Sequence, residues 1–148
     1  MKKVYFDASV LIAGLLSPFG GSGKLITFVP DGNIIGLTSQ TVIEEIMSHQ
    51  SKIKKTKKEI IEYIQKNKII IRNEIFFKDI EKILHLMIDL NDAHVFAGAL
   101  LTKADFMVSL DKKHILHPDV KLKFPGIRIC SPKELLSILN KKGLTLTK

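Results

Sequence analysis

The stretch Val4-Tyr5-Phe6-Asp7-Ala8-Ser9-Val10-Leu11-Ile12 decides the fold of this 148-residue chain. Three apolar residues lead directly into an acid, and a second, mostly apolar run follows it. This pattern predicts a short buried strand over residues 3–6 and a helix over residues 8–16. A carboxylate between two buried segments is costly unless it is paired or bound to a cation. We therefore interpret Asp7 either as the N-cap of the helix or as part of a charged site.

Three further acids, Glu45, Asp92 and Asp111, stand beside or within apolar segments. Asp111 follows a buried strand predicted over residues 106–110, as Asp7 follows the first strand. Asp92 begins an apolar helix, and Glu45 lies within another. In parallel α/β sheets, ligands bind beyond the carboxyl ends of the strands, so we expect these acids to converge there. Converging carboxylates need a cation, and the sequence therefore predicts a divalent metal site made only of oxygen ligands.

Each acid also has a simpler interpretation. Asp7 and Asp92 could each cap a helix, since Asp is a good N-cap residue. Glu45 could lie on a solvated helix face. Glu44 competes with Glu45 for any role in a site, because adjacent helical residues point about 100° apart around the helix axis. The order of the four acids along the chain favours one shared site over these separate explanations.

Short apolar strands alternate with helices along the chain. Strands are predicted over residues 3–6, 34–37, 68–72, 106–110 and 127–130. Helices are predicted over residues 8–16, 24–29, 41–48, 52–67, 77–89, 92–102 and 133–139. This alternation predicts an α/β fold, a three-layer α/β/α arrangement with a mostly parallel central sheet of about five strands. We expect a single domain over residues 1–140 and a basic C-terminal tail over residues 141–148.

The chain is basic, with a formal net charge of +8. A charge of this sign favours an anionic partner, of which nucleic acid is the commonest. Nearly all of the positive charge comes from Lys, since Arg72 and Arg128 are the only arginines. Attraction by point charges is therefore expected rather than bidentate recognition. A basic helix face is interpreted either as a nucleic-acid-binding surface or as an ordinary solvated face; its residues are Lys54, Lys55, Lys57 and Lys58.

Other features narrow the class of protein. Cys130 is the only cysteine, which excludes an internal disulfide and a cysteine-based zinc site. The apolar run over residues 8–16 is too short to span a bilayer, so we expect a cytoplasmic protein with no membrane partner. The histidines show no paired metal spacing. His94 is expected at the edge of the core or at the surface, and His114 and His117 could lie near the site.

Taken in order, the acids and their surroundings resemble those of the PIN domain family, metal-dependent nucleases common among the toxins of bacterial and archaeal toxin–antitoxin pairs. The resemblance covers roughly residues 1–140. It rests on Val4-Tyr5-Phe6-Asp7-Ala8-Ser9-Val10-Leu11-Ile12-Ala13, Leu15-Leu16-Ser17-Pro18, Thr38-Ser39, Glu44-Glu45-Ile46, Asn91-Asp92-Ala93-His94-Val95, Ala104-Asp105-Phe106-Met107-Val108-Ser109-Leu110-Asp111 and Ile127-Arg128-Ile129-Cys130-Ser131-Pro132-Lys133-Glu134-Leu135. It places the four acids of the family at Asp7, Glu45, Asp92 and Asp111, and its supporting polar residues at Ser9 and Ser109.

The resemblance implies an endoribonuclease that hydrolyses phosphodiester bonds with Mg²⁺ or Mn²⁺, as the toxin of a toxin–antitoxin pair would. It assigns Asp7, Asp92 and Asp111 as metal ligands, while Glu45 completes the shell or orients the attacking water. The partners that it implies are an RNA substrate, an antitoxin protein and a second copy of the chain in a homodimer. The alternative from another class is a non-catalytic RNA-binding or protein-interaction module of the same fold.

Overall fold

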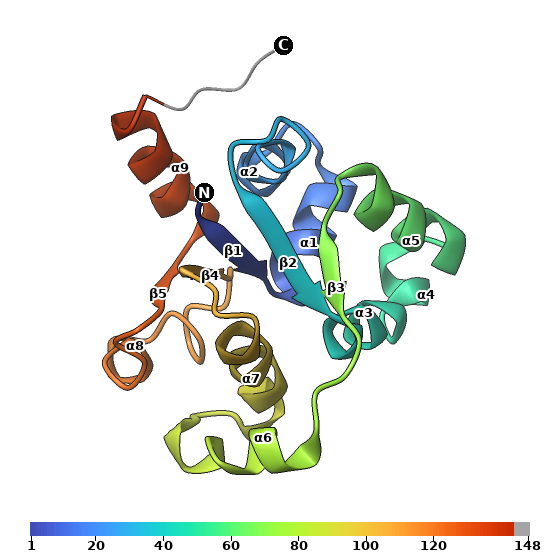
Figure 1. Ribbon diagram of the computed structural model, residues 1–148. Coiled ribbons are helices and arrows are strands. Elements are labelled where there is room, and N and C mark those ends of the chain that lie inside the picture. The colour runs from blue at the N-terminus through green and yellow to red at the C-terminus, as the bar shows by residue number, and fades with distance from the viewer. Residues whose placement is uncertain (144–148) are drawn as a thin grey trace.

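A five-stranded parallel sheet forms the centre of the computed structural model, which describes residues 1–143 (Figure 1). The strand order is β3-β2-β1-β4-β5. The strands are β1 (Lys3–Phe6), β2 (Ile35–Ser39), β3 (Ile70–Arg72), β4 (Phe106–Val108) and β5 (Arg128–Cys130). Every neighbouring pair runs parallel. The predicted parallel sheet is therefore confirmed.

Helices connect the strands and cover both faces of the sheet (Figure 1). Those before β3 are α1 (Ala8–Leu16), α2 (Gly21–Thr27), α3 (Gln40–Met47), α4 (Gln50–Ile53) and α5 (Lys57–Lys66). Those after it are α6 (Phe77–Glu81), the 3₁₀ turns η1 (Leu84–Leu86) and η2 (Leu90–Asp92), α7 (Ala93–Leu101), α8 (Pro118–Lys121) and α9 (Pro132–Lys141). The chain crosses the sheet from β1 to β3 in one direction and returns to β5 in the other. Right-handed crossovers therefore place the two sets of connections on opposite faces, which confirms the three-layer arrangement.

The central strand β1 sets the position of the site. Its residues Val4, Tyr5 and Phe6 are fully buried, as their apolar and aromatic side chains require. The parallel register pairs Phe6 with Val108 of β4. The residues that follow these two, Asp7 and Ser109, therefore lie next to each other at the carboxyl edge of the sheet. The predicted strand over residues 106–110 ends early, at Val108, so Ser109 rather than Asp111 directly follows β4.

Two predicted helices are wrong in length. The helix predicted over residues 52–67 is broken at Lys54, which adopts a left-handed backbone with φ of 56°. A new helix, α5, starts at Lys57 because the N-cap residue Thr56 and Glu59 form a reciprocal capping box. The helix predicted over residues 77–89 ends at Glu81, followed by η1 and then by extended backbone at Met87 and Asp89. The apolar spacing that suggested a longer helix instead anchors an irregular segment to the core.

The remaining predicted boundaries are close to those observed. Helix α2 starts at Gly21 rather than residue 24, and α8 was not predicted. The tail predicted over residues 141–148 begins inside α9, and its last five residues lie outside the described range. Within residues 1–143 no single helix is long and apolar enough to cross a membrane; α1 and α2 meet that criterion only as a pair bent by 98°.

Candidate metal centre

Asp7 lies between β1 and α1 with its carboxylate buried. Its residue surface is only 4% exposed. Oδ1 accepts hydrogen bonds from the Ser9 hydroxyl at 2.6 Å and from the Val10 backbone N–H at 3.2 Å. Oδ2 accepts one from the Ser109 hydroxyl at 2.5 Å. Asp7 is thus an N-cap, but its second oxygen points to the segment after β4, which a cap alone does not require.

The buried carboxyl of Asp7 titrates far from its usual range. Burial raises its pKa from 3.8 to about 6, although the hydrogen bonds from Ser109, Ser9 and Val10 lower it. The nearby charge of Glu45 raises the pKa further. Desolvation therefore outweighs three hydrogen bonds. A cation bound next to Asp7 would offset this cost.

The two serines tie the start of α1 to the segment after β4. The Ser9 hydroxyl accepts a hydrogen bond from the backbone N–H of Leu110 at 3.0 Å. The Ser109 hydroxyl accepts one from the backbone N–H of Asp111 at 3.0 Å. Each serine therefore donates to Asp7 and accepts from the segment that carries Asp111. The structure brings the side chains of Asp7, Ser9 and Ser109 and the backbone of Asp111 into one hydrogen-bond network.

Glu45 enters the cluster through His94, a residue for which the sequence predicts no role in the site. Oε1 of Glu45 lies 3.2 Å from Nε2 of His94, and Nδ1 of the same ring lies 2.8 Å from the Thr41 hydroxyl. The Thr41 hydroxyl contacts Ser39, which in turn bonds the buried Tyr5 hydroxyl. This chain of contacts connects Glu45 to the buried core and fixes the position of its carboxylate. The charge of Glu45 raises the pKa of both Asp7 and Asp92.

Glu44, the competitor of Glu45, points away. It is exposed, whereas Glu45 is half-buried. Helix α3 buries Val42, Ile43 and Ile46, and position 45 lies closer to this buried face than position 44 does. The geometry therefore favours Glu45 as the second acid.

Asp92 does not cap α7, although it occupies the N-cap position. Its side chain makes no capping hydrogen bond, and its backbone is helical rather than extended. Its Oδ2 atom is buried and has no hydrogen-bond partner among residues 1–143. Burial raises its pKa to about 6, and the charges of Asp89, Asp111 and Glu45 add to that rise, opposed by His114. The capping interpretation of Asp92 is thus wrong, and an orphaned carboxylate oxygen in an acidic cluster fits a bound cation.

Two residues without an assigned role join Asp92. Ligand atoms of Asp89, Asp92 and His114 all lie within 4.8 Å of one another. Asp111 adjoins this group: its Oδ2 lies 3.2 Å from Nδ1 of His114, and its Oδ1 accepts the backbone N–H groups of Lys113 and His114. In the sequence the only hints are two i, i+3 spacings, Asp89 to Asp92 and Asp111 to His114. Such spacings are common in turns and do not by themselves indicate a metal site.

The donor set fits the divalent ion that the sequence predicts. The charge of Glu45 acts on both Asp7 and Asp92, and the charge of Asp111 acts on Asp92. Ser109 connects Asp7 to the segment that carries Asp111. Hard oxygen donors of this kind suit Mg²⁺ or Mn²⁺. The His114 imidazole also stands beside Asp92 and Asp111, so a nitrogen atom lies next to these oxygens.

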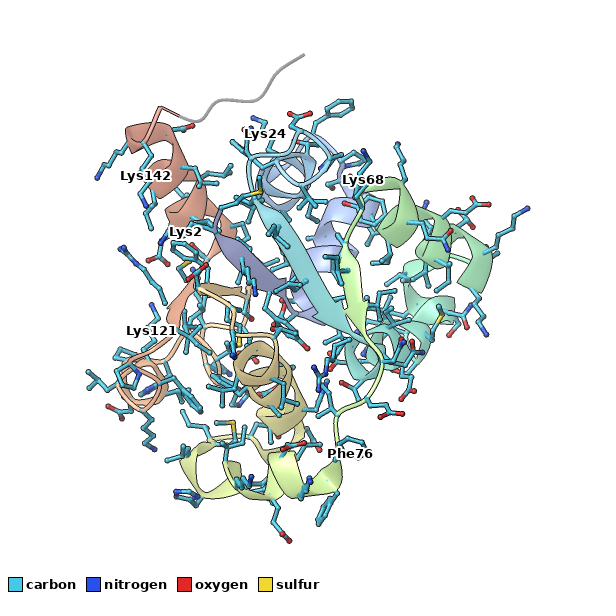
Figure 2. All side chains as sticks on the ribbon, viewed as in Figure 1. Lys2, Lys24, Lys68, Phe76, Lys121 and Lys142 are labelled. Carbon is cyan, nitrogen blue, oxygen red and sulfur yellow. The ribbon has the colours of Figure 1, made fainter. Side chains whose placement is uncertain are left out.

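The predicted basic face, Lys54, Lys55, Lys57 and Lys58, is partly neutralised. Lys55 lies 3.7 Å from Glu59 and Lys58 lies 3.9 Å from Glu62, each one helical turn along. Other lysines are spread over the molecule. Figure 2 shows Lys2, Lys24 and Lys142 on the side of the amino ends of the strands, opposite their carboxyl ends. Lys112 and Lys113 are exposed and directly follow Asp111, so they are the lysines nearest in sequence to the acidic cluster.

Comparison with known proteins identifies the family of the chain. A search of curated proteins found no significant match. Residues 3–113 match the sequence model of the PIN domain, a range that contains all four predicted acids. Because this match covers most of the chain and the parallel α/β/α fold agrees with it, the chain belongs to the PIN domain family.

Proposed function

We propose that this protein is a Mg²⁺- or Mn²⁺-dependent endoribonuclease. The PIN domain is a nuclease-type fold whose members generally use a divalent metal. The observation that carries the proposal is the acidic cluster at the carboxyl edge of the sheet, in which Asp92 Oδ2 is buried without a partner among residues 1–143. Such a cluster is unstable alone and becomes favourable when it holds a cation next to a phosphodiester.

The residues divide into two tasks. Asp7, Asp92 and Asp111 hold the divalent ion, which supplies activation of water and neutralisation of charge on the leaving oxygen. Glu45 stands at the solvent side of the cluster, with its side chain 42% exposed. It orients the attacking water and takes up a proton, while His94 keeps its carboxylate in place. Lys112 and Lys113 directly follow Asp111, and their positive charges attract the phosphate backbone of the substrate.

The choice of RNA over DNA and a role as a toxin come from the resemblance to the PIN family. The same resemblance suggests an antitoxin protein that binds over the site and a homodimeric assembly. Both are parts of the proposal, and the homodimer is tested by its mass in solution. Light scattering coupled to size-exclusion chromatography gives the mass in solution, and a mass of one chain at micromolar concentration would contradict the homodimer.

Cleavage of labelled single-stranded RNA and DNA tests the proposal directly. Cutting is expected with Mg²⁺ or Mn²⁺ and not with EDTA. Asp7→Asn, which keeps the shape but removes the charge, is expected to lower the rate at least about a hundredfold. Asp31→Asn is the matched control, because Asp31 is exposed and distant in sequence from the four acids.

The alternative function is a non-catalytic RNA-binding module. The hydrogen bonds that satisfy both oxygens of Asp7 are the observation in its favour, since they suit a purely structural acid. A folded protein that binds RNA equally well in EDTA and cuts nothing with either metal would support this module. Equal cleavage by Asp7→Asn and the unaltered chain would contradict the assignment of Asp7.

A further inference from the structure

We propose that His114 and Asp89 are ligands of the same divalent ion as Asp92, and that the imidazole makes this centre prefer Mn²⁺ over Mg²⁺. The inference rests on the metal-binding part of the proposed function and deepens it. It does not depend on the identity of the nucleic acid.

The spacing of the three side chains matches a coordination shell. One ligand atom from each of Asp89, Asp92 and His114 lies within 4.8 Å of the others. Metal–ligand bonds of about 2.0–2.2 Å place opposite ligands about 4.0–4.4 Å apart. A small inward movement of half-buried side chains is therefore enough to close the shell around an ion.

The surroundings of the three side chains are negatively charged, so a bound cation would be stabilised there. Asp92 Oδ2 is buried and has no hydrogen-bond partner among residues 1–143. A cation bound to this oxygen would supply the missing partner. Asp89, Asp111 and Glu45 all add negative charge around Asp92. Within the described part of the chain, no Lys or Arg forms an ion pair with these acids.

His114 is held in the manner of a metal-binding histidine. Its Nδ1 lies 3.2 Å from Oδ2 of Asp111, and its backbone N–H donates to Oδ1 of the same side chain at 3.0 Å. A carboxylate that contacts an imidazole in this way fixes the orientation of the ring. The 3.2 Å contact therefore fixes the ring beside Asp89 and Asp92.

The nitrogen donor determines the preference among ions. Mg²⁺ favours oxygen ligands and keeps several waters, whereas imidazole favours first-row transition ions. A shell that contains an imidazole beside its carboxylates therefore gains more from Mn²⁺ than from Mg²⁺. Removal of His114 is expected to reduce this difference.

Metal binding without nucleic acid tests the inference. Isothermal titration of the full chain with MnCl₂ and with MgCl₂ gives both affinities. His114→Ala is expected to weaken Mn²⁺ binding at least about tenfold, with a much smaller change for Mg²⁺. Asp89→Asn is expected to weaken both ions. The matched controls are His85→Ala and Asp31→Asn, which alter exposed residues of the same types outside the cluster.

A spectroscopic readout separates coordination from a structural role. Electron spin-echo modulation of the Mn²⁺-loaded protein is expected to show a directly bound imidazole nitrogen, abolished in His114→Ala and retained in His85→Ala. Absence of that nitrogen signal in the unaltered protein would overturn the inference. So would an equal drop in Mn²⁺ and Mg²⁺ affinity in His114→Ala, because a residue that only supports Asp111 would affect both ions alike. If His114→Ala does not fold, the signal of the unaltered protein decides. Retained nitrogen coordination in a protein that cuts no RNA would leave the inference standing and contradict the nuclease.

Discussion

At the scale of single residues, Asp7 combines a capping role with the features of a metal ligand. Its hydrogen bonds to Ser9, Val10 and Ser109 fix the side chain but do not cancel the cost of burying its charge. The pKa of about 6 records that balance. The same side chain therefore caps the start of α1 and contributes to the cluster a negative charge that burial destabilises.

This balance predicts how stability depends on pH. The raised pKa of Asp7 means that the folded protein binds more protons than the unfolded chain between about pH 4 and pH 6, so the free energy of unfolding falls as pH rises through that window. For Asp7 the shift from 3.8 to about 6 corresponds to about 3 kcal/mol once the group is ionised. Asp92, whose pKa is raised in the same direction, adds to the fall.

Urea denaturation in EDTA at about pH 5 and about pH 8 measures this effect. The unaltered protein is expected to be less stable at the higher pH, and Asp7→Asn is expected to reduce the difference. Millimolar Mn²⁺ is expected to restore stability at the higher pH, because an ion that binds only the folded state stabilises it. An identical pH dependence in Asp7→Asn and in the control Asp31→Asn would show that Asp7 is not the group responsible.

At the scale of elements, close packing of α7 on β1 positions the acids that each element carries. Gly98 of α7 lies against the hydroxyl end of Tyr5 in β1. A Cβ atom at this position would meet the Tyr5 hydroxyl and come within 2.6 Å of its Cζ atom. Tyr5 is fully buried and its hydroxyl bonds Ser39, so the ring cannot move aside cheaply. The approach of α7, and with it the position of Asp92, depends on this glycine.

Gly98→Ala is therefore expected to destabilise the protein by about 1–3 kcal/mol through overpacking, despite the better helix propensity of Ala. Thermal or urea unfolding gives the value. Gly21→Ala is the helical control, since a Cβ there meets nothing within 4 Å. A stability of Gly98→Ala equal to that of Gly21→Ala would contradict the described packing of α7 against β1.

At the scale of the whole molecule, the positive charge is not concentrated at the acidic cluster. The net charge is +8, yet the lysines are spread over the chain, with several on α2, α5 and α9 as well as two after Asp111. Figure 2 shows Lys24, Lys121 and Lys142 well apart from one another. A diffuse field of this kind raises the rate of encounter with an anionic chain without fixing its position. Contacts between single lysines and a bound strand therefore need a separate measurement.

Salt dependence distinguishes direct binding by lysines from diffuse attraction. If the first turn of α5 binds RNA, Lys57→Ala with Lys58→Ala lowers the slope of log affinity against log salt by about 0.7 for each phosphate that the variant no longer neutralises. Fluorescence anisotropy with the Asp7→Asn background gives this slope without cleavage. The matched control is Lys2→Ala with Lys24→Ala, which removes the same charge elsewhere on the surface. Equal slopes for the two double variants would identify α5 as an ordinary solvated helix.

Much of the fold follows from the sequence, because local patterns carry it. Short apolar runs such as Val4-Tyr5-Phe6 predict the strands, and helical apolar spacing predicts most helices. The same patterns fail over residues 77–89, where apolar residues anchor an irregular segment. They also miss the break at Lys54, because a left-handed backbone at a lysine leaves no mark in apolar spacing.

The candidate site divides in the same way. The sequence by itself identified Asp7 at the end of β1, because burial makes such a carboxylate costly, and Asp92 at the start of α7. It misplaced the end of β4, which Ser109 rather than Asp111 follows. Only the tertiary structure placed His94 against Glu45 and brought His114 to Asp89 and Asp92. Those contacts join residues 22 or more positions apart in the chain — separations bridged by strand register and loop conformation. A single local pattern encodes an element, whereas a contact between elements depends on how the whole chain packs.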